Sequence, residues 1–348
     1  MTNTIAIFGL LVVLMAIGMP VGVALGLTVL SFMFIFTDVP LESVALKMFT
    51  GIEKFEIMAI PFFILAGNFL THGGVARRMI NFATSMVGHL RGGLGMSAVL
   101  ACALFAAVSG SSPATVVAIG SILIPAMVKQ GYPLRFGAGV VASAGGLGIL
   151  IPPSIVMVMY SVTTNTSVGA LFMAGVIPGL LLAFMLGLCT WYVARKNNYP
   201  TLPRTSWADR IKHFRKAFWG LMLIVVVMGG IYSGMFTPTE AAAMSAVYAF
   251  FIAVFVYKDL TFKQIPRVLL DSANMSAMLL FIIASAVLFS FILTSEQIPQ
   301  RMADAIVASG MGPIGFLIVV TLLLLVAGAF MEPSAIILIL APILFPIA

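Results

Sequence analysis

The chain has 348 residues, of which 61% are hydrophobic and only 8% are charged, and its mean hydropathy is +1.17. This composition excludes a soluble domain and predicts a polytopic protein surrounded by membrane lipid. The net charge of +7 does not indicate a nucleic-acid partner, because the basic residues fall in short segments between apolar runs. Cys102 and Cys189 lie in apolar runs without metal-type spacing, so we expect both to be small core residues.

Two apolar segments, 5–18 and 21–36, begin the chain on either side of a Met-Pro pair. Together they are too long for one crossing of about 20 residues, so we expect two short helices. The mixed segment 37–56 is typical of a helix or loop at the membrane interface, and 57–71 is the third span. Residues 75–91 mix arginines with apolar residues, which predicts an amphipathic arm at headgroup level.

A polar break follows, the sequence Ser109-Gly110-Ser111-Ser112-Pro113-Ala114-Thr115, which we call the first tip. It joins two apolar runs, 93–108 and 114–127. At 1.5 Å per residue each run covers only about 21 to 24 Å of a hydrocarbon core about 30 Å thick. These lengths predict a re-entrant hairpin, although a hairpin of two full spans would place the flanking charges on the same side as well.

A second break, residues 145–154, is called here the broken segment and interrupts a span over 134–162. A continuous span follows at 168–193. Lipid offers no hydrogen bonds to backbone groups freed at a break, so these groups must face protein, water or a solute. We interpret the two breaks as halves of one binding site. The alternative is that their prolines only kink two packed helices.

The second half of the chain begins with a basic segment, 195–216, which carries seven Lys or Arg residues and one Asp and is predicted to be a cytoplasmic linker. Three spans, a second arm and the two runs of a second hairpin are expected next, in this order: 218–236, 241–257, 272–293, 300–308, 313–329 and 335–347. Met331-Glu332-Pro333-Ser334 would form the second tip.

Landmarks of the first half recur in the second half with offsets of 218 to 223 residues, which indicates an internal repeat. The pairs are Gly18-Met19-Pro20 with 234–238, Arg78-Met79 with Arg301-Met302, Pro113 with Pro333, and Pro125 with Pro346. Five crossings in the first copy would invert the second. The predicted division is into scaffold 1–92, transport half 93–194, linker 195–216, scaffold 217–309 and an incomplete transport half 310–348.

The charge distribution supports an N-terminus outside the cell. On this topology 15 of the 18 basic residues are cytoplasmic, as the positive-inside rule requires. The exceptions on the outer side are Lys47, Lys54 and Arg301.

The polar breaks suggest two ligands. Hydroxyl and carbonyl oxygens without charge suit a hard monovalent cation, for which sodium is the natural choice. The candidate ion-binding residues are Ser109, Gly110, Ser111, Ser112, Gly145, Gly148 and Pro152. Helices that begin after Pro113 and Pro153 would point their positive ends inward and favour a carboxylate-bearing substrate. The candidate substrate-binding residues are Thr115, Pro153, Ser154, Pro333 and Ser334.

Two acids lie in apolar surroundings. Glu240 follows Thr237 by three residues, which favours a helix-capping role. Glu332, on the second tip, is either a second ion or proton site or an interfacial charge.

Other function classes find less support in the residues. The chain lacks a His-Glu-x-x-His zinc pair and a Gly-x-Ser-x-Gly elbow, which argues against an intramembrane enzyme. It also lacks the lysine of a phosphate-binding loop. Duplicated broken hairpins suit an occluded carrier site better than the continuous pore of a channel.

The first tip, the broken segment, the run 236–243 (FTPTEAAA) and Glu332-Pro333-Ser334-Ala335 together resemble the large membrane subunit of tripartite ATP-independent periplasmic (TRAP) transporters, the DctM type. The resemblance covers the whole chain. It implies an elevator-type, sodium-coupled importer of an organic acid, either a dicarboxylate or a sugar acid, in a bacterial inner membrane. It also implies a small four-helix membrane subunit and a periplasmic solute-binding protein as partners, and no organic cofactor. A proton-coupled carrier of the same class is the alternative.

Members of this family continue beyond the length of this chain. The repeat offset of 221 would place the counterpart of the broken segment near 366–374, after Ala348. We therefore expect a truncated member of the family, in which the second tip has no broken segment to pair with and which does not transport by itself.

Overall fold

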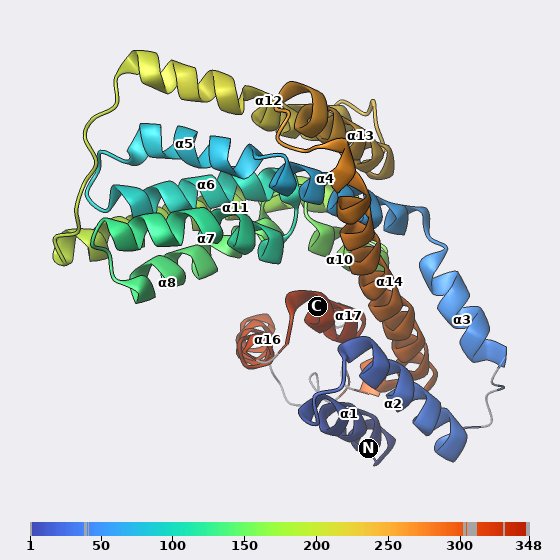
Figure 1. The fold of residues 1–348 in the computed structure, drawn as a ribbon. Coiled ribbons are helices and arrows are strands. Elements are labelled where there is room, and N and C mark those ends of the chain that lie inside the picture. Colours follow the sequence, from blue (N-terminus) through green and yellow to red (C-terminus); the bar gives the residue numbers. More distant parts are fainter. Residues whose placement is uncertain are drawn as a thin grey trace. The chain divides into compact units, whose positions relative to one another are not determined.

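The computed structural model describes residues 2–37, 40, 42–301, 304, 312–329 and 331–345, and every regular element in these ranges is a helix (Figure 1). The all-α prediction is therefore confirmed. The chain folds as two compact units built from discontinuous stretches. Unit 1 comprises Met1–Ile57, Met159–Thr166 and Ser276–Ala348, and unit 2 comprises Met58–Val158 and Ser167–Met275.

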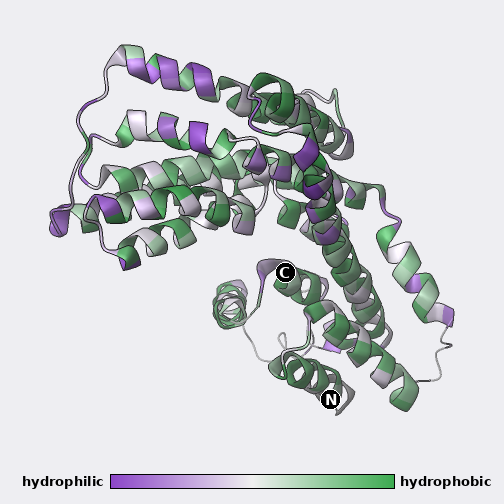
Figure 2. Ribbon diagram, viewed as in Figure 1, coloured by the Kyte–Doolittle hydropathy of each residue, from purple (hydrophilic) through white to green (hydrophobic). Residues whose placement is uncertain are grey.

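The helices have the apolar character expected in a bilayer. Six of those described are long and apolar enough to cross a membrane, or seven if the bent pair Leu134–Leu150 and Ile155–Thr164 counts as one span. Figure 2 shows hydrophobic residues along most helices, whereas hydrophilic residues gather on α5 (Val75–Val87) and in the first half of α12 (Trp207–Tyr232). This is the distribution of a polytopic membrane protein.

Unit 2 is organised around α6 (Gly93–Ser109), which is rich in small residues. Ala98, Cys102 and Phe105 of this helix are fully buried. Helix α6 lies between α5 and α7 (Ser112–Lys129) and also contacts α8 and α11 (Figure 1). The other elements of the unit are α4 (Ala59–His72), α8 (Leu134–Gly145), α9 (Leu147–Leu150), α11 (Val168–Lys196), α12, α13 (Pro238–Phe251), the π-helix η2 (Ile252–Val256) and the 3-10 helix η3 (Phe262–Gln264).

An ionic cluster ties α5 to the loop that follows η2. Asp259 accepts hydrogen bonds from Arg77, at 3.3 Å, and from Arg78. The Arg78 guanidinium also lies 3.8 Å from the ring centre of Tyr257. The Tyr257 hydroxyl donates a hydrogen bond to the carbonyl of Lys216 at 2.8 Å. The cluster therefore joins α5, α12 and the loop after η2 at one end of the unit.

Unit 1 contains α1 (Thr2–Ala16), α2 (Val21–Phe36), α3 (Glu42–Ile52), α16 (Pro313–Gly328) and α17 (Pro333–Leu344). The 3-10 helix η1 (Phe55–Met58), α10 (Ile155–Thr164) and α14 (Ile265–Ser295) have residues in both units. Two glycines, one on α2 and one on α3, allow these helices to pack closely against α14. A Cβ on Gly22 would lie 2.8 Å from the Phe281 ring, and one on Gly51 would lie 2.9 Å from Val287.

Within the described residues, the predicted hairpin runs, the broken span and most of the arm 75–91 appear as helices. The run predicted over 114–127 is longer than expected, because α7 has 18 residues and is long enough to cross a membrane, so its length does not support a re-entrant hairpin. The boundaries also differ around the basic linker. Helix α11 continues to Lys196 and α12 begins at Trp207, well before the predicted residue 218. The early start has a local cause, since the Ser206 hydroxyl accepts a hydrogen bond from the Asp209 N–H at 3.1 Å and caps the helix. Helix α14 likewise begins at Ile265, directly after η3.

One cysteine was assigned wrongly. Cys102 is buried as expected, whereas Cys189 is exposed on α11, where it lines a cavity together with residues of α8 and Val99 of α6. Most of the predicted second arm, 300–308, lies outside the described residues, and so do two repeat landmarks, Met302 and Pro346. The division into scaffold and transport parts stays a prediction.

Candidate functional site

The first tip is a tight turn between α6 and α7. Gly110 caps the C-terminus of α6 with φ of +61°, a left-handed conformation that favours glycine, and its N–H donates to the Ala106 carbonyl at 2.9 Å. Ser111 caps the N-terminus of α7, where its hydroxyl accepts a hydrogen bond from the Ala114 N–H at 3.4 Å. Pro113 lies in the first turn of α7, where a backbone N–H would have no acceptor within the helix, so the N–H that proline lacks costs no hydrogen bond.

Buried hydroxyls line the inside of this turn. The hydroxyl oxygens of Ser109 and Thr115 lie 3.1 Å apart, and these residues are 1% and 0% exposed. Thr115 donates its hydrogen to the Ser111 carbonyl at 2.8 Å, so the Ser109 hydroxyl donates to Thr115. Both oxygens keep lone pairs. These lone pairs, together with the tip carbonyls, are the groups that a cation would contact.

The structure brings the first tip against the broken segment. The Gly110 carbonyl accepts a hydrogen bond from the Ile155 N–H at 3.1 Å. A Cβ on Gly110 would lie 2.8 Å from the Pro153 carbonyl oxygen, and one on Gly148 would lie 2.8 Å from the Ser111 carbonyl. The two breaks are thus in direct backbone contact, which explains why glycine occupies both positions.

The broken segment separates α9 from α10 by an extended stretch with a cis peptide bond between Pro152 and Pro153. Pro152, Pro153 and Ser154 are buried. The Ser154 hydroxyl accepts a hydrogen bond from the Met157 N–H at 3.4 Å and so caps the start of α10. Because the tip backbone meets the backbone at Pro153 and Ile155, the N-terminal turns of α7 and α10 lie at one place. Both would favour a negative group there.

Gly145 lies on the other side of the same contact. A Cβ at this position would be 2.1 Å from a methyl group of Val116, a residue in the first turns of α7. Nine predicted site residues therefore belong to one cluster: Ser109, Gly110, Ser111, Ser112, Thr115, Gly145, Gly148, Pro153 and Ser154. Pro152 is buried beside them. Their roles in binding remain predictions.

The second tip belongs to unit 1 and is described by itself. Glu332 is exposed and occupies the position before α17, and the Ser334 hydroxyl donates to its carboxylate at 3.2 Å. Pro333 occupies the first turn of α17. The contact with Ser334 engages one oxygen of the Glu332 carboxylate, and the other oxygen has lone pairs for a further partner.

Glu240 has the capping role that the sequence predicted. Its carboxylate accepts hydrogen bonds from the N–H and the hydroxyl of Thr237 at 2.8 and 2.9 Å, and its own N–H donates to the Thr237 hydroxyl at 3.3 Å. This reciprocal pair is a capping box at the start of α13. The carboxylate is therefore used in starting a helix.

Sequence reasoning missed the contribution of α4 to the site. A Cβ on Gly67 would lie 3.2 Å from the Ser109 carbonyl oxygen, so α4 closes another side of the first tip. The next residue, Asn68, donates a hydrogen bond to the Ser272 hydroxyl at 2.8 Å. An asparagine within an apolar span is the signal that would have indicated a polar contact here.

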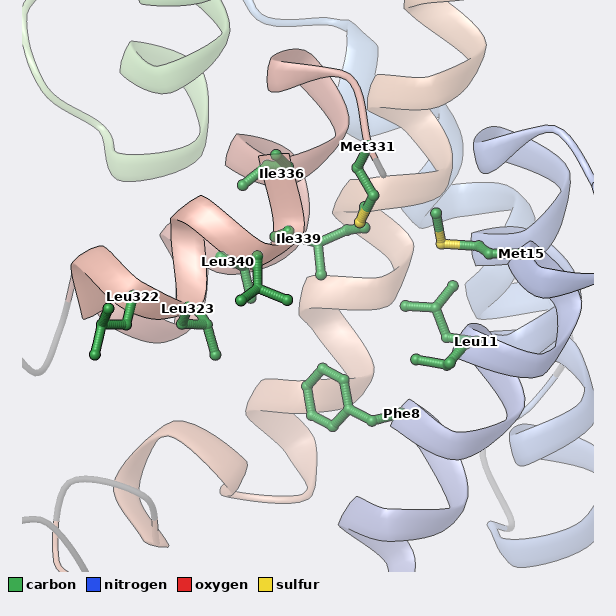
Figure 3. A pocket seen from close by; sticks show the side chains of 12 residues that line it. Phe8, Leu11, Met15, Leu322, Leu323, Met331, Ile336, Ile339 and Leu340 are labelled. Atoms are coloured by element: carbon green, nitrogen blue, oxygen red, sulfur yellow. The ribbon is translucent and has the colours of Figure 1, made fainter. Parts of the chain in front are cut away.

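An apolar groove in unit 1 is unsuited to an organic acid. Its accessible volume is about 470 Å³, and it is lined by side chains of α1, α16 and α17 such as Leu11, Met15, Leu323, Ile339 and Leu340 (Figure 3). None of its lining side chains carries a charge or a hydrogen-bond donor. A carboxylate placed there would lose its hydration without replacement.

Comparison with known proteins identifies the family. The profile of the DctM component of tripartite ATP-independent periplasmic transporters matches residues 8–348. The C4-dicarboxylate TRAP transporter large permease protein of Rhodobacter capsulatus is 66% identical over 99% of this chain and 82% of its own length. The corresponding protein of Pseudomonas aeruginosa is 57% identical over 93% of this chain and 76% of its own length.

A sialic acid TRAP transporter large permease protein of Vibrio cholerae is 39% identical over 99% of this chain and 80% of its own length. Proteins with these names move solutes and are not enzymes. The present chain is related to them and has several apolar helices, so it is a multi-pass protein of the inner membrane. The chain belongs to the DctM family, the large permease components of tripartite ATP-independent periplasmic transporters.

Proposed function

We propose that this permease imports C4-dicarboxylates by sodium-coupled transport. The substrate class is supported by the two relatives named for C4-dicarboxylates, at 66% and 57% identity, against 39% for the relative named for sialic acid. The observation that carries the proposal is the direct contact between the first tip and the broken segment, where buried neutral oxygens and two helix N-termini lie together.

Sodium is the coupling ion in this proposal. Ser109 and Thr115 supply buried hydroxyl oxygens, and the turn at Gly110 and Ser111 supplies carbonyl oxygens. Because none of the nine residues of this cluster is charged, it suits a monovalent cation that exchanges its water shell for neutral oxygens. Bound sodium would place a positive charge beside the N-termini of α7 and α10. A substrate carboxylate would then bind more tightly when sodium is present, which is the basis of coupled transport.

The remaining parts of the proposal follow the family. A TRAP system is tripartite, so a small membrane subunit and a periplasmic binding protein are the expected partners, and the binding protein would deliver the acid. An elevator movement would carry the site across the membrane. Proton coupling through Glu332, which lies exposed at the start of α17, is the competing coupling mode.

Uptake of labelled succinate into proteoliposomes tests the proposal. The permease is reconstituted with its small subunit and binding protein, and sodium and pH gradients are varied separately. We expect saturable uptake that requires an inward sodium gradient and competition by other C4-dicarboxylates but not by sialic acid. Uptake driven by a proton gradient alone would instead support the role of Glu332.

Three serine variants locate the ion site. Ser109→Ala and Ser112→Ala should raise the half-saturating sodium concentration, because they remove oxygens from the first tip. Ser97→Ala is the matched control. The Ser97 hydroxyl is buried on α6, the helix of Ser109, but donates to the Gly93 carbonyl at 2.6 Å and lies outside the first tip. If both tip variants keep the wild-type sodium dependence, sodium binds elsewhere.

A further inference from the structure

Unit 1 contains a polar cavity that is separate from the residues of the first tip. It has a volume of about 310 Å³ and is lined by α3, by Lys54 just after it, by the end of α10, by α14 and by one residue of α17. Its polar lining includes Lys47, Lys54, Thr50, Ser290 and Thr294. The volume is at the lower end of the range of about 300–1,000 Å³ typical of small-molecule sites.

Lys54 is held in place by the end of α10. Its ammonium donates hydrogen bonds to the Val162 carbonyl and to the Asn165 side-chain oxygen, both at 2.8 Å. These bonds stabilise the C-terminal turn of α10, which accounts for part of the role of this lysine. An ammonium has three N–H donors, so one remains for a ligand in the cavity.

Lys47 lacks such an anchor. Its ammonium lies 4.9 Å from the ring centre of Phe291, and the residue is half-buried. The ion pairs recorded for the described residues join Asp259 to Arg77 and Arg78, and neither cavity lysine takes part in one. Glu53 and Glu56 lie near Lys54 in the sequence, but both are exposed and neither lines the cavity. Two positive charges thus share one cavity, and none of the described residues that line it carries a carboxylate.

The hydroxyls of the cavity differ in what they can donate. Thr50 and Thr294 donate to the Leu46 and Ser290 carbonyls of their own helices, at 2.9 and 2.8 Å. Their single hydrogens are therefore used. The side chain of Ser290, with Lys47 and Lys54, can donate to a bound molecule. Such a set of donors selects an anion.

The position of these lysines in the chain is also unusual. Lys47 and Lys54 are two of the three basic residues that the charge distribution assigns to the outer side of the membrane. Basic residues on that side oppose the positive-inside bias. The fold places both of them in the same cavity, so orientation in the membrane does not account for them.

We infer that this cavity is a second anion site, which binds a carboxylate of the dicarboxylate substrate on the outer side, independently of sodium. The identity of the anion rests on the proposed function, whereas the existence of an anion site rests on the cavity and its donors. Ammonium groups in a partly desolvated cavity attract a carboxylate more strongly than lysines in bulk water do.

Binding of succinate to the purified 348-residue chain in nonionic detergent tests the inference. The measurement is isothermal titration in sodium-free choline buffer at low ionic strength, because salt screens exposed charges. We expect Lys47→Gln to weaken binding about tenfold and Lys47→Arg to retain it. Lys263→Gln is the matched control, because it removes the same charge from an exposed residue in η3. The melting temperature of each variant shows that the fold is kept.

Several results would overturn the inference. Wild-type affinity in Lys47→Gln would overturn it, and so would a loss of affinity in Lys263→Gln as large as the loss in Lys47→Gln. Equal affinity for inorganic phosphate would assign the cavity to phosphate groups, such as those of lipids, and would contradict the substrate class. Ser112→Ala, a tip variant, should keep this sodium-free binding while its uptake changes. If the wild-type protein shows no sodium-driven uptake of succinate but still binds succinate in a way that depends on Lys47, the transport proposal is wrong and the anion site is retained.

Discussion

Gly110→Ala tests whether the first tip and the broken segment form one site. An alanine at φ of +61° costs about 1–2 kcal/mol, since this conformation disfavours a Cβ. The new Cβ would also lie 2.8 Å from the Pro153 carbonyl oxygen, and such overpacking costs about 1–3 kcal/mol. We therefore expect a loss of about 2–5 kcal/mol in the free energy of unfolding, together with loss of sodium-dependent uptake.

Substitutions at two other glycines measure the conformational cost and the packing cost separately. Gly131 has φ of +89°, but a Cβ there would have nothing within 4 Å, so Gly131→Ala should lose only the conformational part, about 1–2 kcal/mol. Gly148 does not have a positive φ, but a Cβ there would lie 2.8 Å from the Ser111 backbone. Gly148→Ala should therefore lose only the packing part, about 1–3 kcal/mol.

The assay is unfolding of the three variants in mixed micelles with increasing denaturing detergent, followed by helical circular dichroism. Succinate uptake is measured on the same preparations. We expect Gly110→Ala to be the least stable of the three variants and Gly131→Ala to transport normally. If Gly110→Ala and Gly131→Ala lose the same stability and both transport, the close contact between Gly110 and Pro153 does not exist, and the shared site has no basis.

Three further predictions concern topology and local stability. Cys189 is exposed, so labelling is done in a Cys189→Ser background. In that background, a cysteine at Asn197 should react only from the cytoplasm and one at Ser295 only from the periplasm. Labelling of both from one side would disprove the inverted repeat. Thr237→Ala should lower the melting temperature by removing the capping box of α13, whereas Thr237→Ser should restore it, and equal melting temperatures would contradict the role of the cap. Asp259→Asn should destabilise unit 2 by about 1–3 kcal/mol, because two arginines lose a charged acceptor, and an unchanged denaturation midpoint would show that the cluster contributes nothing.

Local patterns in the sequence determined the class of the protein and the positions of its elements. Apolar runs of span length predicted most of the helices, because a helix in lipid satisfies its backbone within one continuous segment. The break at 145–154 was visible because prolines and glycines interrupt such a run, and the capping box at Thr237 was visible because its two residues are three positions apart. Helix starts set by polar residues, such as the start of α12 at Trp207, were less well placed, because hydropathy does not mark them.

Contacts between distant segments were decided by tertiary structure alone. The Gly110 carbonyl meets the Ile155 N–H across 45 positions of sequence, and Gly67 of α4 closes the tip from a third segment. Lys47 and Lys54 share a cavity with residues of α10 and α14 that lie more than 100 positions away. No periodicity or spacing encodes such pairs, because they depend on how the helices pack. The sequence indicated which residues were polar within the membrane, and the packing of the helices determined which of them lie together.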